Sequence, residues 1–139
     1  ELVKHAKTLG CMVYSADNPA ASDFILPAVA KIGEVRIAIS TTGKSPAMAR
    51  ELRQRIEKLI TQEDLLQIKL QTYIRGILKK QILDQKARRK IVYRILEDEE
   101  LKRFLKEGKF EEAKEMAKKI LETADKNAGG KASSGGLKR

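Results

Sequence analysis

The sequence lacks most of the residue types on which several classes of function depend. Its 139 residues include no tryptophan, one cysteine (Cys11) and one histidine (His5). A single cysteine cannot form an internal disulfide. One cysteine and one histidine also give no ligand spacing typical of a resident metal site. Three tyrosines and three phenylalanines are too few for the stacking platforms of a single-strand binder. We expect no bound metal, a buried Cys11 thiol in a strand, and a surface or packing role for His5.

Long hydrophobic runs are also missing. No apolar stretch approaches the roughly 20 residues that a membrane-spanning helix needs, and no basic-then-apolar leader opens the sequence. We therefore expect a cytoplasmic protein without membrane contact. Because the sequence opens at Glu1 in the middle of a helical pattern and without methionine, we also expect a fragment.

Positive charge, by contrast, is abundant. Lysine and arginine number 29 against 19 acidic residues, which gives a formal net charge of +10. The excess lies after residue 46, and its densest cluster is Lys86-Ala87-Arg88-Arg89-Lys90 (KARRK). Such a cluster is either the solvated face of a helix or a surface for an anionic partner. One candidate function is thus a basic helical module that binds nucleic acid or an acidic protein, although the scarcity of aromatics disfavours nucleic acid.

Residues 1–26 show the pattern of the closing half of a βαβ unit. Apolar residues recur at helical spacing over residues 2–9, and Gly10 is a typical left-handed stop after a helix. The run CMVYSA (residues 11–16) is of strand type. Helix, glycine and strand in this order predict part of an α/β domain.

Asp17 follows this predicted strand directly, and Asn18-Pro19 then turns the chain. Ligands of open α/β sheets bind at the carboxyl ends of the strands, so Asp17 is a candidate for polar chemistry. A cap on the turn, or on a short helix beginning near Ala20, explains the same residue equally well. Position alone leaves both interpretations open.

Residues 27–40 predict a β-hairpin. Apolar and polar residues alternate on both sides of Gly33-Glu34, and a two-residue loop with glycine first is typical of a type II′ turn. Pro27 lacks an amide proton and fits the start of the first strand.

The segment STTGKSP (residues 40–46) leads into a helix, with Ser45 as its N-cap and Pro46 in its first turn. Hydroxyls, a glycine amide and a lysine at a helix N-terminus form a candidate anion cradle. The segment is not a nucleotide-binding P-loop, because the first glycine of that motif would fall at Ala38. The apolar stripe of the helix is expected to comprise Met48, Leu52, Ile56 and Leu59 or Ile60.

The sequence after Glu57 is rich in helix-forming residues. Gly76 is a weak point in the first of the expected helices, Gly108 ends the third, and the tail from Asn127 is linker-like. Apolar residues at helical spacing predict four helices, around residues 66–78, 91–96, 101–105 and 113–121.

The stretch from Val13 to Ile60 resembles the precorrin-2 dehydrogenase family, which is also the dehydrogenase module of siroheme synthase. The resemblance rests on the Asp-x-Pro turn, DFILPA, the hairpin ending in IAISTTGKSP, and AxARELRxxIE. It implies an α/β remnant of a Rossmann domain, a hairpin-and-helix dimerisation region and an α-helical C-terminal domain, with the chain mostly α overall. The implied boundaries are 1–26 for the NAD-binding part, 27–60 for dimerisation, 61–126 for the helical domain and 127–139 for a flexible tail.

The resemblance also implies an activity. Family members form homodimers that oxidise precorrin-2 to sirohydrochlorin with NAD, and some then insert ferrous iron as a substrate. No GxGxxG spacing occurs in the sequence. The glycine motif for NAD is therefore expected upstream of Glu1, and the chain alone is expected to be inactive.

Carried over residue by residue, Asp17 matches the family's catalytic aspartate, the implied general base. Ser40 and Thr41 match the hydroxyl pair before the glycine, where some members carry a phosphorylatable serine in place of the threonine. The KARRK cluster is expected, like Lys44 and Arg50, to pair with carboxylates of the substrate. The predicted site comprises Asp17 as catalytic base and Ser40, Thr41, Gly43, Lys44, Ser45 and Arg50 as substrate-binding residues.

Overall fold

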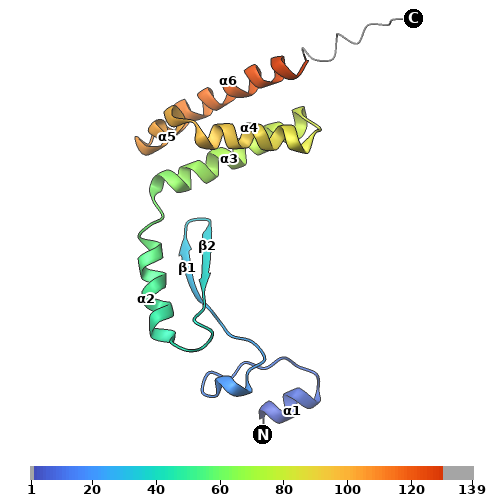
Figure 1. Ribbon diagram of the computed structural model, residues 1–139, viewed down its shortest axis with the longest axis vertical. Coiled ribbons are helices and arrows are strands. Elements are labelled where there is room, and N and C mark those ends of the chain that lie inside the picture. The colour runs from blue at the N-terminus through green and yellow to red at the C-terminus, as the bar shows by residue number, and fades with distance from the viewer. Residues whose placement is uncertain (1, 130–139) are drawn as a thin grey trace, which may run out of the picture. The chain divides into compact units, whose positions relative to one another are not determined.

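A computed structural model describes residues 2–129 and divides the chain into two compact units (Figure 1). Unit 1 is Glu1–Ile60, and unit 2 begins at Thr61. Unit 1 contains α1 (Leu2–Thr8), a 3₁₀ turn η1 (Pro19–Ala21), β1 (Ala28–Ile32), β2 (Val35–Ile39) and α2 (Pro46–Glu57). Unit 2 contains α3 (Gln62–Gln81), α4 (Gln85–Glu97), α5 (Glu99–Lys106) and α6 (Phe110–Gly129). The expectation of a mostly helical chain is confirmed.

The predicted hairpin is present. Strands β1 and β2 pair antiparallel with Ile32 opposite Val35, so the loop is Gly33-Glu34 as expected. Gly33 has φ +53° and Glu34 does not have a positive φ, which is the pattern of a type II′ turn. Helix α2 packs against the hairpin, beside which it runs in Figure 1.

The apolar stripe of α2 differs from the predicted one by one position. Ala49 is buried, whereas Met48 is 44% exposed. Leu52 and Ile56 are half-buried as expected. The small Ala49 allows the helix to approach the hairpin closely, and the neighbouring Met48 is therefore turned outward.

The expected strand over residues 11–16 is wrong, and no parallel sheet is present among residues 2–129. The backbone N–H and C=O groups of a strand need hydrogen-bond partners on a neighbouring strand. Here side-chain oxygens accept the hydrogen bonds of two backbone amides instead. The Val13 amide donates to Asp23 Oδ2 at 2.8 Å, and the Ser15 amide donates to Ser22 Oγ at 2.9 Å. Cys11, expected to be buried in the strand, is exposed for the same reason.

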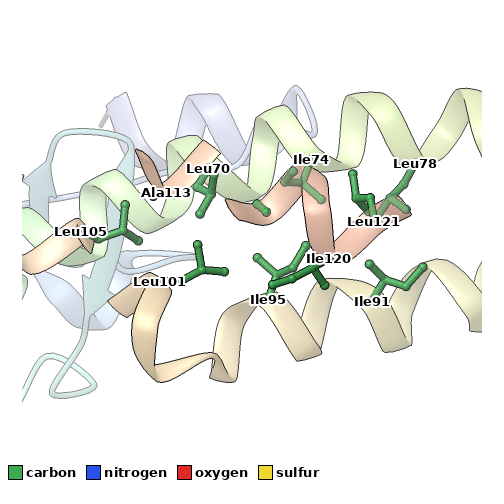
Figure 2. Packing of buried hydrophobic residues seen from close by; sticks show 11 residues of the cluster. Leu70, Ile74, Leu78, Ile91, Ile95, Leu101, Leu105, Ala113, Ile120 and Leu121 are labelled. Atoms are coloured by element: carbon green, nitrogen blue, oxygen red, sulfur yellow. The ribbon is translucent and has the colours of Figure 1, made fainter. Parts of the chain in front are cut away.

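Unit 2 has one continuous apolar core (Figure 2). The predicted helical patterns supply it, because their apolar residues face one another across four helices. The fully buried large side chains are Leu70, Ile74, Leu78, Ile95, Leu101 and Leu105. No helix within residues 2–129 is long and apolar enough to cross a membrane.

The C-terminal helix extends past the boundary expected at residue 126. Helix α6 continues to Gly129. The predicted mobile tail otherwise falls on residues 130–139, which lie outside the described residues.

Two glycines of unit 2 are expected to respond in opposite ways to alanine. Gly76 lies inside α3 without a positive φ, and a Cβ there would meet no atom within 4 Å. Gly76→Ala should therefore raise the free energy of unfolding by about 0.5–1 kcal/mol. Gly108 has φ +73° and closes α5, where Lys109 N donates to Phe104 O and Gly108 N to Leu105 O. Gly108→Ala should lower the same free energy by about 1–2 kcal/mol.

Urea denaturation of the two variants beside the parent measures both effects. A stabilising Gly108→Ala, or a destabilising Gly76→Ala, would contradict this account of the two helices.

Candidate functional site

Unit 1 contains a hollow of about 320 Å³ that brings together four segments of the chain. Residues within 14–22, the stretch 24–28, the turn 39–43, and Pro46 and Ala49 of α2 all contribute to its lining. Its polar side chains are Ser15, Ser22, Ser40 and Thr41, and its larger apolar ones include Tyr14, Phe24, Ile25, Leu26 and Ile39. The lining is thus apolar with a few hydroxyls, which is typical of a binding site for an organic ligand.

Asp17 lies in the bend between two lining residues, Ala16 and Pro19, although it does not itself line the hollow. Its side chain is exposed and forms no hydrogen bond or ion pair with any residue among 2–129. The turn is closed instead by Ser15 Oγ, which accepts from the Asn18 amide at 3.3 Å. Among residues 2–129, no side-chain bond supports the capping interpretation of Asp17, and the N-cap position of the short turn η1 is Asn18.

Asp23, the neighbouring carboxylate, is fully engaged. Its oxygens accept from the Val13 amide at 2.8 Å and lie 3.2 Å from Lys7 Nζ. These two interactions, the amide first, lower the pKa of Asp23 below its ordinary value. Asp23 therefore has a structural role, because its bonds tie α1 and residues 11–16 to the start of the stretch 24–28.

Three hydroxyls hold the turn between β2 and α2. Thr41 Oγ1 accepts from the Ser45 amide at 3.1 Å and donates to the Ser45 carbonyl at 2.9 Å. Ser40 Oγ accepts from the Thr42 amide, and Ser45 Oγ caps α2 by accepting from the Met48 amide. Both Ser40 and Ser45 therefore keep an O–H donor for a ligand, whereas Thr41 already uses its only O–H donor within the turn.

Gly43 follows Thr42 in this turn, and both have a positive φ, +54° for Thr42 and +78° for Gly43. A side chain at Gly43 would face Ile25 Cδ1 at 3.8 Å, so the backbone angle rather than space requires glycine here. Ser40, Thr41 and Gly43 all line the hollow.

The two predicted cationic residues of the site do not line the hollow. Lys44 and Arg50 are exposed, form no ion pair with a described residue, and do not line the hollow. Ser45 does not line it either. The structure therefore groups Ser40, Thr41 and Gly43, and it leaves the remaining predicted residues, Asp17 included, outside the lining of the hollow.

Sequence reasoning missed the aromatic pair of the site. The rings of Tyr14 and Phe24 stack with their centroids 5.7 Å apart and an interplanar angle of 30°. Both line the hollow and remain partly exposed. The two residues lie ten positions apart, so no local sequence pattern predicts their contact. The hydrogen bonds between Val13 and Asp23 bring them together. Among residues 2–129, no cluster of His, Cys, Asp and Glu could hold a metal ion.

Comparison with known proteins shows that this chain is similar in sequence to several named enzymes. Residues 33–59 match the family model described as "Sirohaem biosynthesis protein central". The chain is 38% identical over 105 residues to a putative precorrin-2 dehydrogenase of Methanocaldococcus jannaschii, across 76% of this chain and 50% of the relative.

Two further relatives carry related names. A precorrin-2 dehydrogenase of Methanosarcina barkeri is 37% identical over 97 residues, across 70% of this chain and 43% of the relative. A siroheme synthase of Methylococcus capsulatus is 35% identical over 120 residues, across 86% of this chain and 24% of the relative. The chain thus spans half or less of the length of these curated relatives.

Proposed function

We propose, from the confirmed resemblance of this chain to precorrin-2 dehydrogenases and siroheme synthases, that it serves siroheme biosynthesis as part of an enzyme that oxidises precorrin-2 to sirohydrochlorin. The observation that carries the proposal is that the Asp17 carboxylate bonds to no described residue and lies in the bend between Ala16 and Pro19, two residues that line a hollow with hydroxyls and an aromatic pair.

The chemistry assigned to this chain is proton removal and substrate binding. Oxidation of precorrin-2 takes away a hydride and a proton, and Asp17 accepts the proton as general base. The free O–H groups of Ser40 and Ser45 and the cations of Lys44 and Arg50 bind carboxylates of the tetrapyrrole. Iron insertion, implied by the resemblance for some members, would use the same carboxylate with ferrous iron as a substrate.

NAD is the proposed hydride acceptor, but the residues of this chain do not fit it. A dinucleotide pyrophosphate needs a glycine-rich turn between a parallel strand and a helix N-terminus. The sequence has no such glycine spacing, and the strands within residues 2–129 form one antiparallel hairpin. The proposal therefore places NAD on residues outside this chain.

Calorimetry tests this placement. The 139-residue chain should give no saturable heat with NAD, because it offers no site for the pyrophosphate. The positive control is a longer protein in which these residues follow a glycine-rich βα unit. A micromolar dissociation constant for the chain alone would contradict the placement of the cofactor.

A homodimer formed by the hairpin and α2 is part of the proposal. Among its described residues, unit 1 buries only Ala30 and Ala49 below one tenth of their surface. Val29 remains 48% exposed on the outer face of β1, and Met48 is 44% exposed on α2. An apolar surface of this kind next to a short sheet favours pairing with a second copy.

Met48→Asp should convert the dimer to monomer or aggregate in light scattering. An acidic side chain in the first turn of α2 favours the helix dipole, so the substitution does not weaken the helix itself. Gln54→Asp, at an exposed polar position of the same helix, is the matched control. Ile37 is a poorer probe because it pairs with the buried Ala30 on the inner face of the hairpin. A Met48→Asp protein that remains dimeric would place the interface elsewhere.

The function is tested by anaerobic incubation of precorrin-2 and NAD with the longer enzyme that contains these residues. Sirohydrochlorin formation supports the proposal, and its absence with a folded protein refutes it. Strong binding of duplex nucleic acid that weakens steeply with salt would instead support the basic-module alternative.

A further inference from the structure

The positive charges on α3 and α4 differ from most of those on α5 and α6. On α5 and α6, Lys102, Arg103, Lys114 and Lys118 each pair with an acidic residue three positions earlier. None of the nine lysines and arginines on α3 and α4 forms an ion pair with a described residue. The charge of α3 and α4 is therefore left without a partner in the part of the chain that the structure describes.

Some of these cations surround a concave site between the two helices, which run side by side in Figure 1. The site has a volume of about 390 Å³ and is lined only by α3 and α4. Its lining is Arg75, Leu78 and Lys79 from α3 with Gln85, Arg88, Arg89 and Val92 from α4. We call this site the α3–α4 basic pocket; it contains four cations, one amide and no acidic side chain.

Arg88 is fixed in place by the turn that joins the helices. It is half-buried, and its Nη1 donates to the carbonyls of Ile82 and Leu83 at 2.7 and 2.8 Å. A guanidinium carries five N–H donors, so donors on its other nitrogens remain for a ligand. The nearby Asp84 carboxylate accepts from the Lys86 and Ala87 amides at the start of α4 and is thus occupied.

Arg89 is also oriented by a neighbour. Its guanidinium carbon lies 5.5 Å from the ring centroid of Tyr93, one turn further along α4. Stacking of this kind restricts the side chain without neutralising its charge. Two restrained guanidinium groups therefore share one concave lining with the cations of Arg75 and Lys79 and the apolar side chains of Leu78 and Val92, which favours binding of an anion.

We propose that the α3–α4 basic pocket binds a compact anion that carries two or more negative charges on oxygen atoms. Planar guanidinium groups match the oxygen pairs of phosphates and carboxylates, and four cations in one concavity favour a multiply charged ligand. A phosphate ester and a polycarboxylate share this chemistry. The lining of the pocket contains no aromatic ring on which a base could stack, so it does not suit an extended nucleic-acid strand.

Calorimetry on the full 139-residue chain at low ionic strength tests the proposal, with pyrophosphate and citrate as separate probes. The test variant is Arg75→Gln with Arg89→Gln, which removes one pocket cation from each helix. The matched control is Lys80→Gln with Lys90→Gln, which removes the same charge from the same helices at exposed positions outside the pocket. Arg88 is left unchanged because its bonds to the turn affect folding, and circular dichroism melts check that both variants are folded.

We expect saturable binding of at least one probe, and the stronger probe identifies phosphate or carboxylate as the preferred ligand. The pocket variant should bind that probe at least about tenfold more weakly, while the control should stay within about twofold of the parent. The proposal is overturned if neither probe gives saturable heat, or if both variants weaken binding equally, since diffuse charge then explains the effect. It is also overturned if a duplex RNA binds tightly and is weakened more by the Lys80/Lys90 control than by the pocket variant.

Discussion

Replacing Asp17 with asparagine should lower the rate of precorrin-2 oxidation by about 100- to 10,000-fold, the usual contribution of a positioned general base. Asparagine keeps the shape of the side chain but cannot accept the proton. The carboxylate makes no bond to the described residues, so its replacement should leave the thermal midpoint and NAD binding unchanged. The measurement is sirohydrochlorin formation by the longer enzyme under anaerobic conditions, with thermal melts for folding.

Asp23→Asn is the matched control, since it makes the same chemical change six residues away. Because the asparagine side-chain oxygen can still accept from the Val13 amide, this variant should cost little activity, with turnover within about threefold of the parent, below the range for a lost base. If instead Asp17→Asn stays within that factor, Asp17 is not the base.

The same control variant should show a pH-dependent stability defect. The folded-state pKa of Asp23 is lowered by the Val13 amide and Lys7. Its contribution is therefore present above the unfolded-state pKa of about 3.9 and is lost as the pH falls through the folded-state value. The melting curves of Asp23→Asn and the parent should differ at neutral pH and converge in acid. A difference that persists in acid would show that the charge of Asp23 is not its cause.

Truncating Leu70 in α3 to alanine should lower the free energy of unfolding by about 2–5 kcal/mol. Leu70 is 0% exposed and packs within the core that joins all four helices of unit 2. Removing its branched end costs the transfer free energy of the lost atoms and leaves a cavity that the surrounding helices fill only in part. Equilibrium denaturation in urea measures the change.

Leu83→Ala is the control for the same chemical change on the surface. Leu83 is 95% exposed in the turn between α3 and α4, so its truncation should stay within about 0.5 kcal/mol of the parent. Equal effects of the two substitutions would mean that Leu70 does not belong to a packed core.

Much of the fold could be predicted because its signals are local. Gly33 at the first position of a two-residue loop, Ser45 before Pro46, and Gly108 after a helical pattern each act through the backbone of a few adjacent residues. The helices of unit 2 are similarly encoded, since the 3.6-residue period of their apolar residues requires no knowledge of the partner.

The errors concern features that depend on distant residues. The run CMVYSA has the composition of a strand, yet its backbone groups bond to Ser22 and to Asp23. Through that same contact Asp23 is engaged, whereas Asp17 bonds to no residue among 2–129. The α3–α4 basic pocket was also beyond local reasoning, because the cluster KARRK does not reveal that Arg88 and Arg89 face Arg75 and Lys79 across a turn.

The pH dependence of turnover tests the central claim, that Asp17 takes the proton from precorrin-2, most directly. A general base works only when deprotonated, so the rate of the parent enzyme should fall in acid. The acid limb of its pH–rate profile should follow the protonation of one carboxylate. Asp17→Asn should retain a low rate that no longer shows this limb, while Asp23→Asn should keep the limb of the parent. An Asp17→Asn enzyme whose rate falls in acid along the same limb as the parent would contradict the assignment of Asp17 as the base.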